Sequence, residues 1–393
     1  MAKTAKAELK LIARTRPRVL RGHPWVYANE VQQTLPREFD GKAIPLRDAR
    51  GRQLGVGIYN SQSQICWRRL KPRGKGADFD ARYLRETVSA AIALREKRVP
   101  GHFRRLVASD ADYVPGLVVD QFGGVLLVQG LTKAVDLRMQ TITTILRELL
   151  DPEEIIYRND SPVRALEGLK EEVGTYSGLP YAARWFQVDG IEYFLDLGSP
   201  GKARFHLEQR SQHTRVASYA RGRIVLDAFC NLGSFGLQCA EAGAQKVIAV
   251  DLAEEAIKLT RLNAGKNQLA IQATRGDVFT YFNGLKKKDL FDLIVLSPPS
   301  FARNRKAVAN AVRNYKDMNL KGLKALSPGG ILATYSCSPY IDGPTFENVV
   351  HEAAILAKRN LRILETVEQP LDHPVLLNLA ESRFLRGYIL EVA

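Results

Sequence analysis

Hydrophobic and polar positions follow a repeating pattern over the last 170 residues of this chain. From about residue 223, short apolar runs alternate with segments of helical spacing. The runs predict strands near residues 224–229, 246–251, 271–277, 290–297 and 329–337, with a helix after each of them except the third. Repeated strand–helix units predict a parallel sheet covered by helices on both faces, that is, an α/β fold of Rossmann-like type. Ligands are expected at the carboxyl ends of such strands.

The first half of the chain shows two other patterns. Residues 1–76 contain short strands interrupted by Gly, Pro and Asn, which predict a small β-barrel. Residues 77–186 contain helical patterns at 81–98 and 137–150 and a hairpin signal at Phe122-Gly123-Gly124, which predict a small mixed α/β domain. A third domain is predicted over residues 187–393, led by a β-hairpin within 187–205.

The stretch from Ile224 to Asp251 reads as strand, turn, helix and strand, the beginning of a nucleotide-type binding site. Its turn contains Gly233 and Gly236 as the only glycines. A dinucleotide site needs three glycines so that backbone can approach a pyrophosphate. The turn also contains larger side chains: Phe229, Asn231, Ser234 and Phe235. A phosphate-free adenosine cofactor such as S-adenosylmethionine fits this turn better.

Three aspartates follow three neighbouring strands. Asp227 and Asp251 are 24 residues apart, close to the spacing at which a second-strand acid binds ribose hydroxyls. Asp277, followed by Val278, is expected beside the adenine, whose exocyclic amine needs an acceptor. One acid at one strand end is usually incidental, whereas three of them behind a glycine turn predict a cofactor site.

Two further strand ends carry candidate chemistry. Ser297-Pro298-Pro299 is a rigid loop that can orient a planar base, although a proline pair can also simply end a strand. Cys337 follows the next strand and is placed to act as a nucleophile if its thiolate is stabilised, although a lone cysteine is often a core residue. Cys66 and Cys239 are interpreted as packing residues. No C-x-x-C pair occurs, so neither a disulfide framework nor a metal site is indicated.

Charge changes the picture at the N-terminal end. The formal net charge is +15, and residues 1–76 contain 17 Lys and Arg against 5 Asp and Glu. This concentration favours a polyanion such as nucleic acid over a merely solvated basic face. No apolar run approaches the length of a membrane span, and the basic N-terminus lacks the apolar core of a secretory signal. A reducing cytoplasm is therefore the expected location.

A family resemblance rests on a series of motifs: HLEQR, LDAFCNLGSFGL, AVD, GDVF, SPPSFARNRKAV, NYKDMN, TYSCS, DHPV and FLRGY. In this order and spacing they resemble the large-subunit ribosomal RNA 5-cytosine methyltransferases with an N-terminal PUA domain. The likeness covers nearly the whole chain, since GHPWVY and the strands after it look like the PUA domain. It implies S-adenosylmethionine as cofactor, with Gln209 and Arg210 beside it, and large-subunit ribosomal RNA, free or in an assembling particle, as partner. A homodimer is compatible with the sequence.

The resemblance also implies a mechanism. Cys337 corresponds to the family's proposed nucleophile, whose thiolate adds to cytosine C6 so that C5 can take up the methyl group. A base then removes the C5 proton and the cysteine leaves; Asp372 or His373 is a candidate, although a turn-forming role is favoured for both. Ser297 departs from the family pattern, which has Asp before the two prolines. Methylation of a guanine or adenine nitrogen is therefore kept as an alternative, as is a non-catalytic RNA-binding assembly factor.

Basic residues in two segments are candidate phosphate contacts. A solvated helix face explains the second segment nearly as well. The candidates in the two segments are Arg68, Arg69 and Lys71, and Arg303, Arg305, Lys306 and Lys316.

Overall fold

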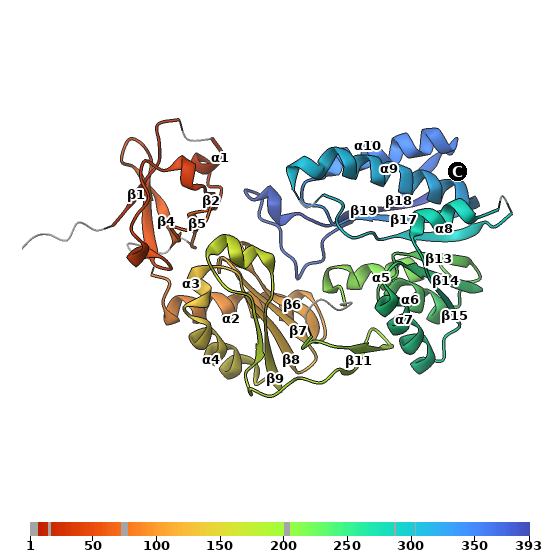
Figure 1. Ribbon diagram of the computed structural model, residues 1–393, viewed down its shortest axis with the longest axis horizontal. Coiled ribbons are helices and arrows are strands. Elements are labelled where there is room, and N and C mark those ends of the chain that lie inside the picture. Colours follow the sequence, from red (N-terminus) through yellow and green to blue (C-terminus); the bar gives the residue numbers. More distant parts are fainter. Residues whose placement is uncertain (1–6, 15–16, 72–77, 200–204, 287, 303) are drawn as a thin grey trace, which may run out of the picture. The chain divides into compact units, whose positions relative to one another are not determined.

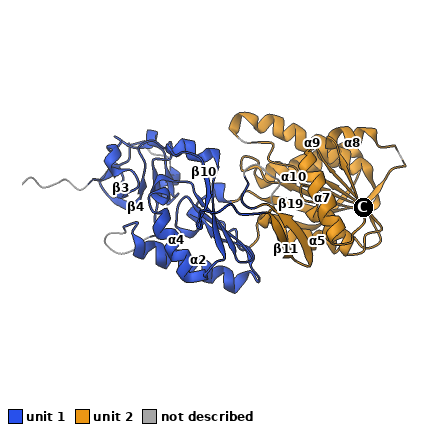
Figure 2. Cartoon of the chain, turned by 60° about the horizontal axis from the view of Figure 1, so that its bottom comes forward, with its two compact units in different colours: residues 1–182, 197–200, 371–382 blue, residues 183–196, 201–370, 383–393 orange. Residues whose placement is uncertain are grey.

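The computed structural model describes residues 7–14, 17–71, 78–199, 205–286, 288–302 and 304–393. The chain divides into two compact units (Figure 2). The first comprises residues 1–182, 197–200 and 371–382, and the second comprises residues 183–196, 201–370 and 383–393. Among the described residues, every helix is too short or too polar to cross a membrane. The predicted domain boundaries at residues 76 and 186 stay a prediction.

The N-terminal part of the first unit is a five-stranded sheet around its own apolar core. Leu46, Tyr59 and Trp67 are almost completely buried in this core. The strand order is β1 (Leu9–Lys10), β3 (Ala43–Arg47), β4 (Gln53–Tyr59), β5 (Trp67–Arg69) and β2 (Trp25–Val26). The short helix α1 (Pro17–Leu20) comes between β1 and β2 in the chain, and its Val19 belongs to this core.

The central part of the first unit is a second five-stranded sheet with helices packed against it (Figure 1). Its predicted hairpin and its helix over residues 81–98 are present. The second helix begins at Met139, two residues later than predicted, and ends where Asp151 adopts a left-handed conformation before Pro152. The strands in order are β10 (Glu172–Thr175), β9 (Glu154–Asn159), β8 (Val125–Gly130), β7 (Leu117–Phe122) and β6 (Phe103–Ala108). The helices are α2 (Ala81–Arg98), α3 (Lys133–Asp136) and α4 (Met139–Leu150).

The second unit contains a seven-stranded sheet whose first five strands are parallel, as the alternating pattern predicted. The strand order is β15 (Ile271–Arg275), β14 (Lys246–Asp251), β13 (Ile224–Ala228), β16 (Phe291–Leu296), β17 (Leu326–Ser336), β19 (Arg386–Val392) and β18 (Leu361–Glu368). The two remaining strands were not predicted: β19 runs antiparallel to its neighbours β17 and β18, so β18 has the same direction as the first five strands. The whole is the expected Rossmann-like α/β architecture.

Helices cover both faces of this sheet (Figure 1). One face packs against α8 (Val278–Gly284), α9 (Val308–Ala325) and α10 (Gly343–Ala357). The other packs against α5 (Arg210–Ala217), α6 (Ser234–Glu241) and α7 (Glu254–Lys266). Because side chains alternate between faces along each strand, the central strands β13 and β16 are mostly apolar on both sides and mostly buried, with Asp227 as a buried polar exception.

The hairpin that leads this unit lies earlier than predicted. Strands β11 (Arg184–Val188) and β12 (Ile191–Leu195) pair around Asp189 and Gly190, both with positive φ. Asp-Gly between two apolar runs is a strong signal for such a turn, whereas the predicted hairpin was placed within residues 187–205, after the observed start of β11 at Arg184. Residues 200–204 of that predicted hairpin lie outside the described residues.

Residues 371–382, which connect β18 to β19, belong to the first unit. There the buried Arg95 forms a two-pronged ion pair with Asp112 and donates to the carbonyl of Asp372 at 3.1 Å. The Asp372 carboxylate accepts from the Arg105 backbone N–H at 2.9 Å and contacts His373 at 3.0 Å. Asp372 and His373 are therefore engaged inside the first unit.

Candidate functional site

A cavity of about 510 Å³ opens at the carboxyl ends of the parallel strands in the second unit. Because β13, β14 and β16 end at the same edge, the loops that follow them meet around it. Most of the predicted site residues line this cavity: Gln209, Phe229, Asn231, Ser234, Phe235, Asp251, Asp277, Val278, Ser297, Pro298 and Cys337. Arg210, Asp227 and Gly233 are the predicted residues that do not line it.

The turn after β13 has an unusual backbone. Phe229, Asn231 and Gly233 have φ values of 65°, 50° and 80°, all in the left-handed region that only glycine adopts freely. Two buried side chains of α7 hold this conformation: Thr260 donates to the Asn231 carbonyl at 3.1 Å and Asn263 to the Leu232 carbonyl at 3.2 Å. Strain that is held by its surroundings in this way is typical of ligand-binding turns.

Asp227 supports the turn from behind. Its side chain is fully buried, and Oδ2 accepts from the backbone N–H of Gly236 at 2.8 Å, near the start of α6. Burial raises the pKa of this carboxyl to about 7, and the nearby charge of Asp251 adds to the effect. Asp227 therefore shapes the cavity wall without forming its surface.

Asp251 and Asp277 each combine a backbone role with exposure to the cavity. Asp251 accepts from the backbone N–H groups of Asn231 at 3.0 Å and Ala253 at 2.9 Å. Asp277 caps α8, because Oδ1 accepts from the N–H of Thr280 at 2.8 Å. Each carboxylate oxygen has two lone pairs, so both aspartates keep acceptor capacity for a ligand.

The neighbouring side chains of Gln209 and Arg210 lie in different environments. Gln209 is buried and faces the cavity, whereas Arg210 forms a two-pronged ion pair with Asp189 of the β11–β12 turn. His213, four residues after Gln209, also lines the cavity. Its ring packs edge-on against that of Phe235, with 4.6 Å between the ring centroids. Burial lowers the pKa of His213 to about 3, which keeps its imidazole neutral.

Ser297 and Cys337 meet through Gln209. The Gln209 amide nitrogen lies 2.9 Å from Ser297 Oγ and 3.6 Å from Cys337 Sγ. Behind the cysteine, the buried hydroxyls of Ser336 and Ser338 both lie 3.1 Å from the hydroxyl of Tyr315 on α9. Ser338 also contacts Ser300 of the proline loop at 2.9 Å. These hydrogen bonds connect the cysteine loop to the proline loop. The serines on either side of Cys337 therefore have a structural role.

The thiol of Cys337 is partly buried, and its surroundings favour the protonated form. Burial, helped by the negative charge of Glu208, raises its pKa to about 12. The hydrogen bond from Gln209 and the positive charge of Arg386 act in the opposite direction. A free thiolate is therefore scarce at neutral pH in this state of the protein.

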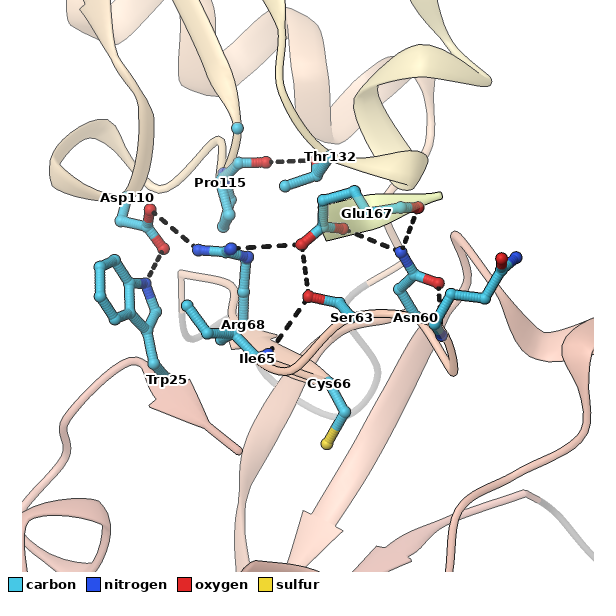
Figure 3. Close-up of polar contacts among 12 residues, drawn as sticks. Trp25, Asn60, Ser63, Ile65, Cys66, Arg68, Asp110, Pro115, Thr132 and Glu167 are labelled. Carbon is cyan, nitrogen blue, oxygen red and sulfur yellow. Dashed lines mark hydrogen bonds and ion pairs between the residues drawn. The ribbon is translucent and has the colours of Figure 1, made fainter. Parts of the chain in front are cut away.

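Two of the three basic candidates in the N-terminal segment, Arg68 and Arg69, have partners within the first unit, and Figure 3 shows those of Arg68. Arg68 pairs with Glu167 at 3.3 Å and lies over the Trp25 ring, whose N–H donates to Asp110 at 2.9 Å. Arg69 donates to a backbone carbonyl, and burial lowers the pKa of its guanidinium. Both charges are used within the first unit, which does not favour them as phosphate contacts; the exposed Lys71 keeps that role as a prediction.

The basic residues after the proline loop differ in exposure and in ion pairing. Arg305 and Lys306 are exposed in a short 3₁₀ helix before α9, whereas Lys316 pairs with Glu352 at 3.1 Å. Arg303 lies outside the described residues. Arg305 and Lys306 therefore stay the candidates of this segment.

Several cavity residues were not predicted: His206, Glu208, His213, Cys230, Leu252 and Ser300. Glu208 and His213 lie within five residues of Gln209, so their closeness to a predicted site residue in the sequence could have pointed to them. Leu252 directly follows Asp251, and Ser300 directly follows the predicted proline loop. Among the described residues, no three His, Cys, Asp or Glu side chains gather as a metal site.

Comparison with known proteins agrees with this architecture. Residues 115–385 match the family described as S-adenosylmethionine-dependent methyltransferase, and residues 9–72 match the PUA-like domain. "Ribosomal RNA large subunit methyltransferase I" of Aeromonas hydrophila is 33% identical over 394 residues, covering 98% of this chain and 99% of that protein. The protein of the same name in Serratia proteamaculans is 32% identical, covering 95% and 96%.

Two solved structures share the fold over the whole chain. A crystal structure of SMU.776 complexed with SAH has a TM-score of 0.82 at 20% identity, covering 98% of this chain and 100% of that chain. A structure from Streptococcus mutans, described as an S-adenosylmethionine-dependent methyltransferase, has a TM-score of 0.80 at 19% identity with the same coverage. At these identities the likeness concerns the fold alone.

Proposed function

The chain belongs to the S-adenosylmethionine-dependent methyltransferases that carry a PUA-like domain, and from this premise we propose that it methylates cytosine C5 in large-subunit ribosomal RNA. The observation that carries the choice of base is the contact of Gln209 with both Cys337 and Ser297 at the cavity. It places a thiol and a polar group together where a flipped-out base can enter.

The cavity residues fit S-adenosylmethionine, which supplies a methyl group on a positively charged sulfur when bound. Asp251 is placed to accept from ribose hydroxyls, because its oxygens keep lone pairs beyond their two backbone contacts. Asp277 and Val278 offer an acceptor and an apolar wall for adenine. The turn after β13 carries two glycines, Gly233 and Gly236, instead of the three that a pyrophosphate-binding turn needs, so the site suits a ligand without phosphates.

In the proposed reaction Cys337 acts as nucleophile. A base takes the thiol proton, and the thiolate forms a bond to cytosine C6 while the C5–C6 π electrons shift into the ring and make C5 electron-rich. These electrons would form the new bond from C5 to the methyl group as the methyl–sulfur bond of the donor breaks, and the donor would leave as S-adenosylhomocysteine. Removal of the C5 proton then returns the electron pair that expels the cysteine. Ser336, Ser338 and Tyr315 hold the cysteine loop during these steps. Such positioning of reacting groups can contribute roughly 7–11 kcal/mol to the lowering of a barrier.

Ribosomal RNA as substrate is supported by the relatives of this chain and by its charge. The proteins at 33% and 32% identity are named for that substrate, and the PUA-like domain lies in the most basic part of the chain. All four cysteines are free thiols, which supports a reducing cytoplasm as location. Membership in an enzyme family removes the support for a non-catalytic assembly factor.

A second candidate is methylation of a nitrogen of guanine or adenine. The observation in its favour is the raised pKa of Cys337, about 12, which disfavours the thiolate. In that case Ser297, Pro298 and Pro299 would hold the base and Cys337 would be a packing residue.

One experiment separates the two candidates. The full-length protein is incubated with isotopically labelled S-adenosylmethionine and unmodified large-subunit ribosomal RNA, and the product is sequenced after bisulfite treatment. A cytosine that resists conversion at one position supports C5 methylation. Label incorporation with complete conversion of all cytosines would favour the nitrogen instead.

A further inference from the structure

Gln209 lies at the meeting point of the proline loop and the cysteine loop. It ends the short 3₁₀ helix Leu207–Gln209 and directly precedes α5. Its side chain is 5% exposed and lines the cavity. A buried amide needs hydrogen-bond partners, and here the partners are Ser297 and Cys337.

The amide of Gln209 satisfies both partners at once. Oε1 accepts from the Ser297 hydroxyl at 3.1 Å, while Nε2 lies 2.9 Å from the same hydroxyl oxygen. The nitrogen has two N–H donors, so its second hydrogen is available for Cys337 Sγ at 3.6 Å. One side chain therefore fixes the distance between the proline loop and the thiol.

We propose that Gln209 is a catalytic residue that donates an N–H to the sulfur of Cys337, stabilises it as a thiolate and holds Ser297 beside it. This inference rests on the covalent function proposed above. The reason is that a hydrogen bond strengthens when its acceptor becomes charged, so the donor favours the thiolate over the thiol.

The charged groups around the sulfur act on it in opposite directions. Glu208 disfavours a negative sulfur, whereas Arg386 on β19 favours it. The phenols of Tyr315 and Tyr335 stay neutral because burial raises the pKa of each. Gln209 is a neutral donor in direct contact with Sγ, and its effect does not depend on pH.

Alkylation of Cys337 by iodoacetamide measures this effect without RNA. The thiolate forms a carbon–sulfur bond, iodide leaves, and the thiol proton goes to the buffer. The other three cysteines are buried, and mass spectrometry assigns the label to Cys337. Rates are compared across pH 7–10 for the full-length protein and two variants, Gln209→Met and Gln212→Met. Methionine keeps the approximate volume of glutamine without its N–H, and Gln212 is a buried glutamine of α5 that does not line the cavity.

At each pH, Gln209→Met should be alkylated about three- to tenfold more slowly than the wild type, because its thiolate fraction is smaller. Gln212→Met should stay within about twofold. Gln209→Glu should be slower still, since an ionised carboxylate repels the thiolate. In methylation assays Gln209→Met should lower kcat by a larger factor than it changes the affinity for S-adenosylmethionine.

Equal alkylation rates for the wild type and Gln209→Met, with cofactor affinity showing a folded site, would overturn the inference. This outcome is independent of the covalent function, which fails only if Cys337→Ala still methylates RNA. Slowed alkylation together with a fully active Cys337→Ala variant would overturn the catalytic role of Gln209 along with the covalent mechanism.

Discussion

Individual carboxylates determine the chemistry of the cavity wall. Their roles differ, although in the sequence each of them occurs at the end of a predicted strand. Asp227 is buried behind the turn, Asp251 joins the turn to β14, and Asp277 caps α8. The strand-end rule predicted correctly that they would gather at one edge of the sheet. It could not predict which of them faces the cavity, because that depends on backbone N–H groups contributed by other segments.

The role of Asp251 can be tested with the cofactor alone. Asp251→Ala should weaken binding of S-adenosylmethionine by about 10- to 100-fold, the effect of losing hydrogen bonds to a charged acceptor of about 1.5–3 kcal/mol. Titration calorimetry measures this affinity. Glu254→Ala, which removes an exposed carboxylate three residues later, is the control and should bind normally. Unchanged affinity in Asp251→Ala would refute the ribose assignment.

The raised pKa of Asp227 predicts a dependence of stability on pH. The folded protein retains a proton on this carboxyl up to about pH 7, whereas the unfolded chain releases it near the ordinary value of 3.8. Its contribution to the free energy of unfolding therefore falls as pH rises between these values, by at most about 1.4 kcal/mol per pH unit. Asp227→Asn should remove this fall. Urea unfolding of both proteins from pH 4 to 8 is the measurement, and parallel curves would contradict the prediction.

At the scale of elements, the turn after β13 depends on α7. A Cβ on Gly233 would lie 2.7 Å from the Thr260 side chain, and the residue has a φ of 80°. Helix α7 thus packs so closely that glycine is required here for two reasons. Gly222, with a φ of 71°, has open space around it and offers a comparison.

Gly233→Ala should cost about 2–4 kcal/mol of folding free energy, because backbone strain and a steric clash add. Gly222→Ala has the strain alone and should cost about 1–2 kcal/mol. Denaturant unfolding compares the two variants. If both lose the same stability, the close contact with α7 does not constrain the turn.

Elements with a regular period were predicted well, and elements without one were not. Residues 81–98 form a helix with the predicted bounds because their apolar spacing is helical and Asp80 caps the first turn. Strand β18 contains a bulge between Ile363 and Glu365, which disturbs the alternation that marks a strand. The hairpin before α5 begins at Arg184, before the predicted start at residue 187, because the Asp189-Gly190 turn was not used as a signal.

At the scale of the whole molecule, each compact unit is held by contacts between segments far apart in sequence. In the first unit Glu167 binds Asn60, Ser63 and Arg68, so about 100 residues separate the partners (Figure 3). The charge excess of the N-terminal segment was visible in the sequence. Which of its arginines are paired internally was not, because the partners lie in another part of the chain.

The variant Arg68→Met therefore distinguishes a structural role of Arg68 from a role in binding RNA. The side chains of Arg68 and Glu167 are 11% and 3% exposed, and removing one partner of a buried pair costs about 3–5 kcal/mol. The variant should lose stability by roughly that amount in denaturant unfolding. Arg82→Met, at a position whose side chain is 83% exposed, should show no measurable change. A stable Arg68→Met variant with weakened RNA binding would return Arg68 to the phosphate contacts.

The covalent mechanism depends on one atom, the sulfur of Cys337. The most direct test is incorporation of labelled methyl groups into large-subunit ribosomal RNA by Cys337→Ala, with calorimetry as proof that the variant still binds S-adenosylmethionine. The mechanism predicts no incorporation above background and a cofactor affinity within about threefold of the wild type. Incorporation at the wild-type rate would contradict it.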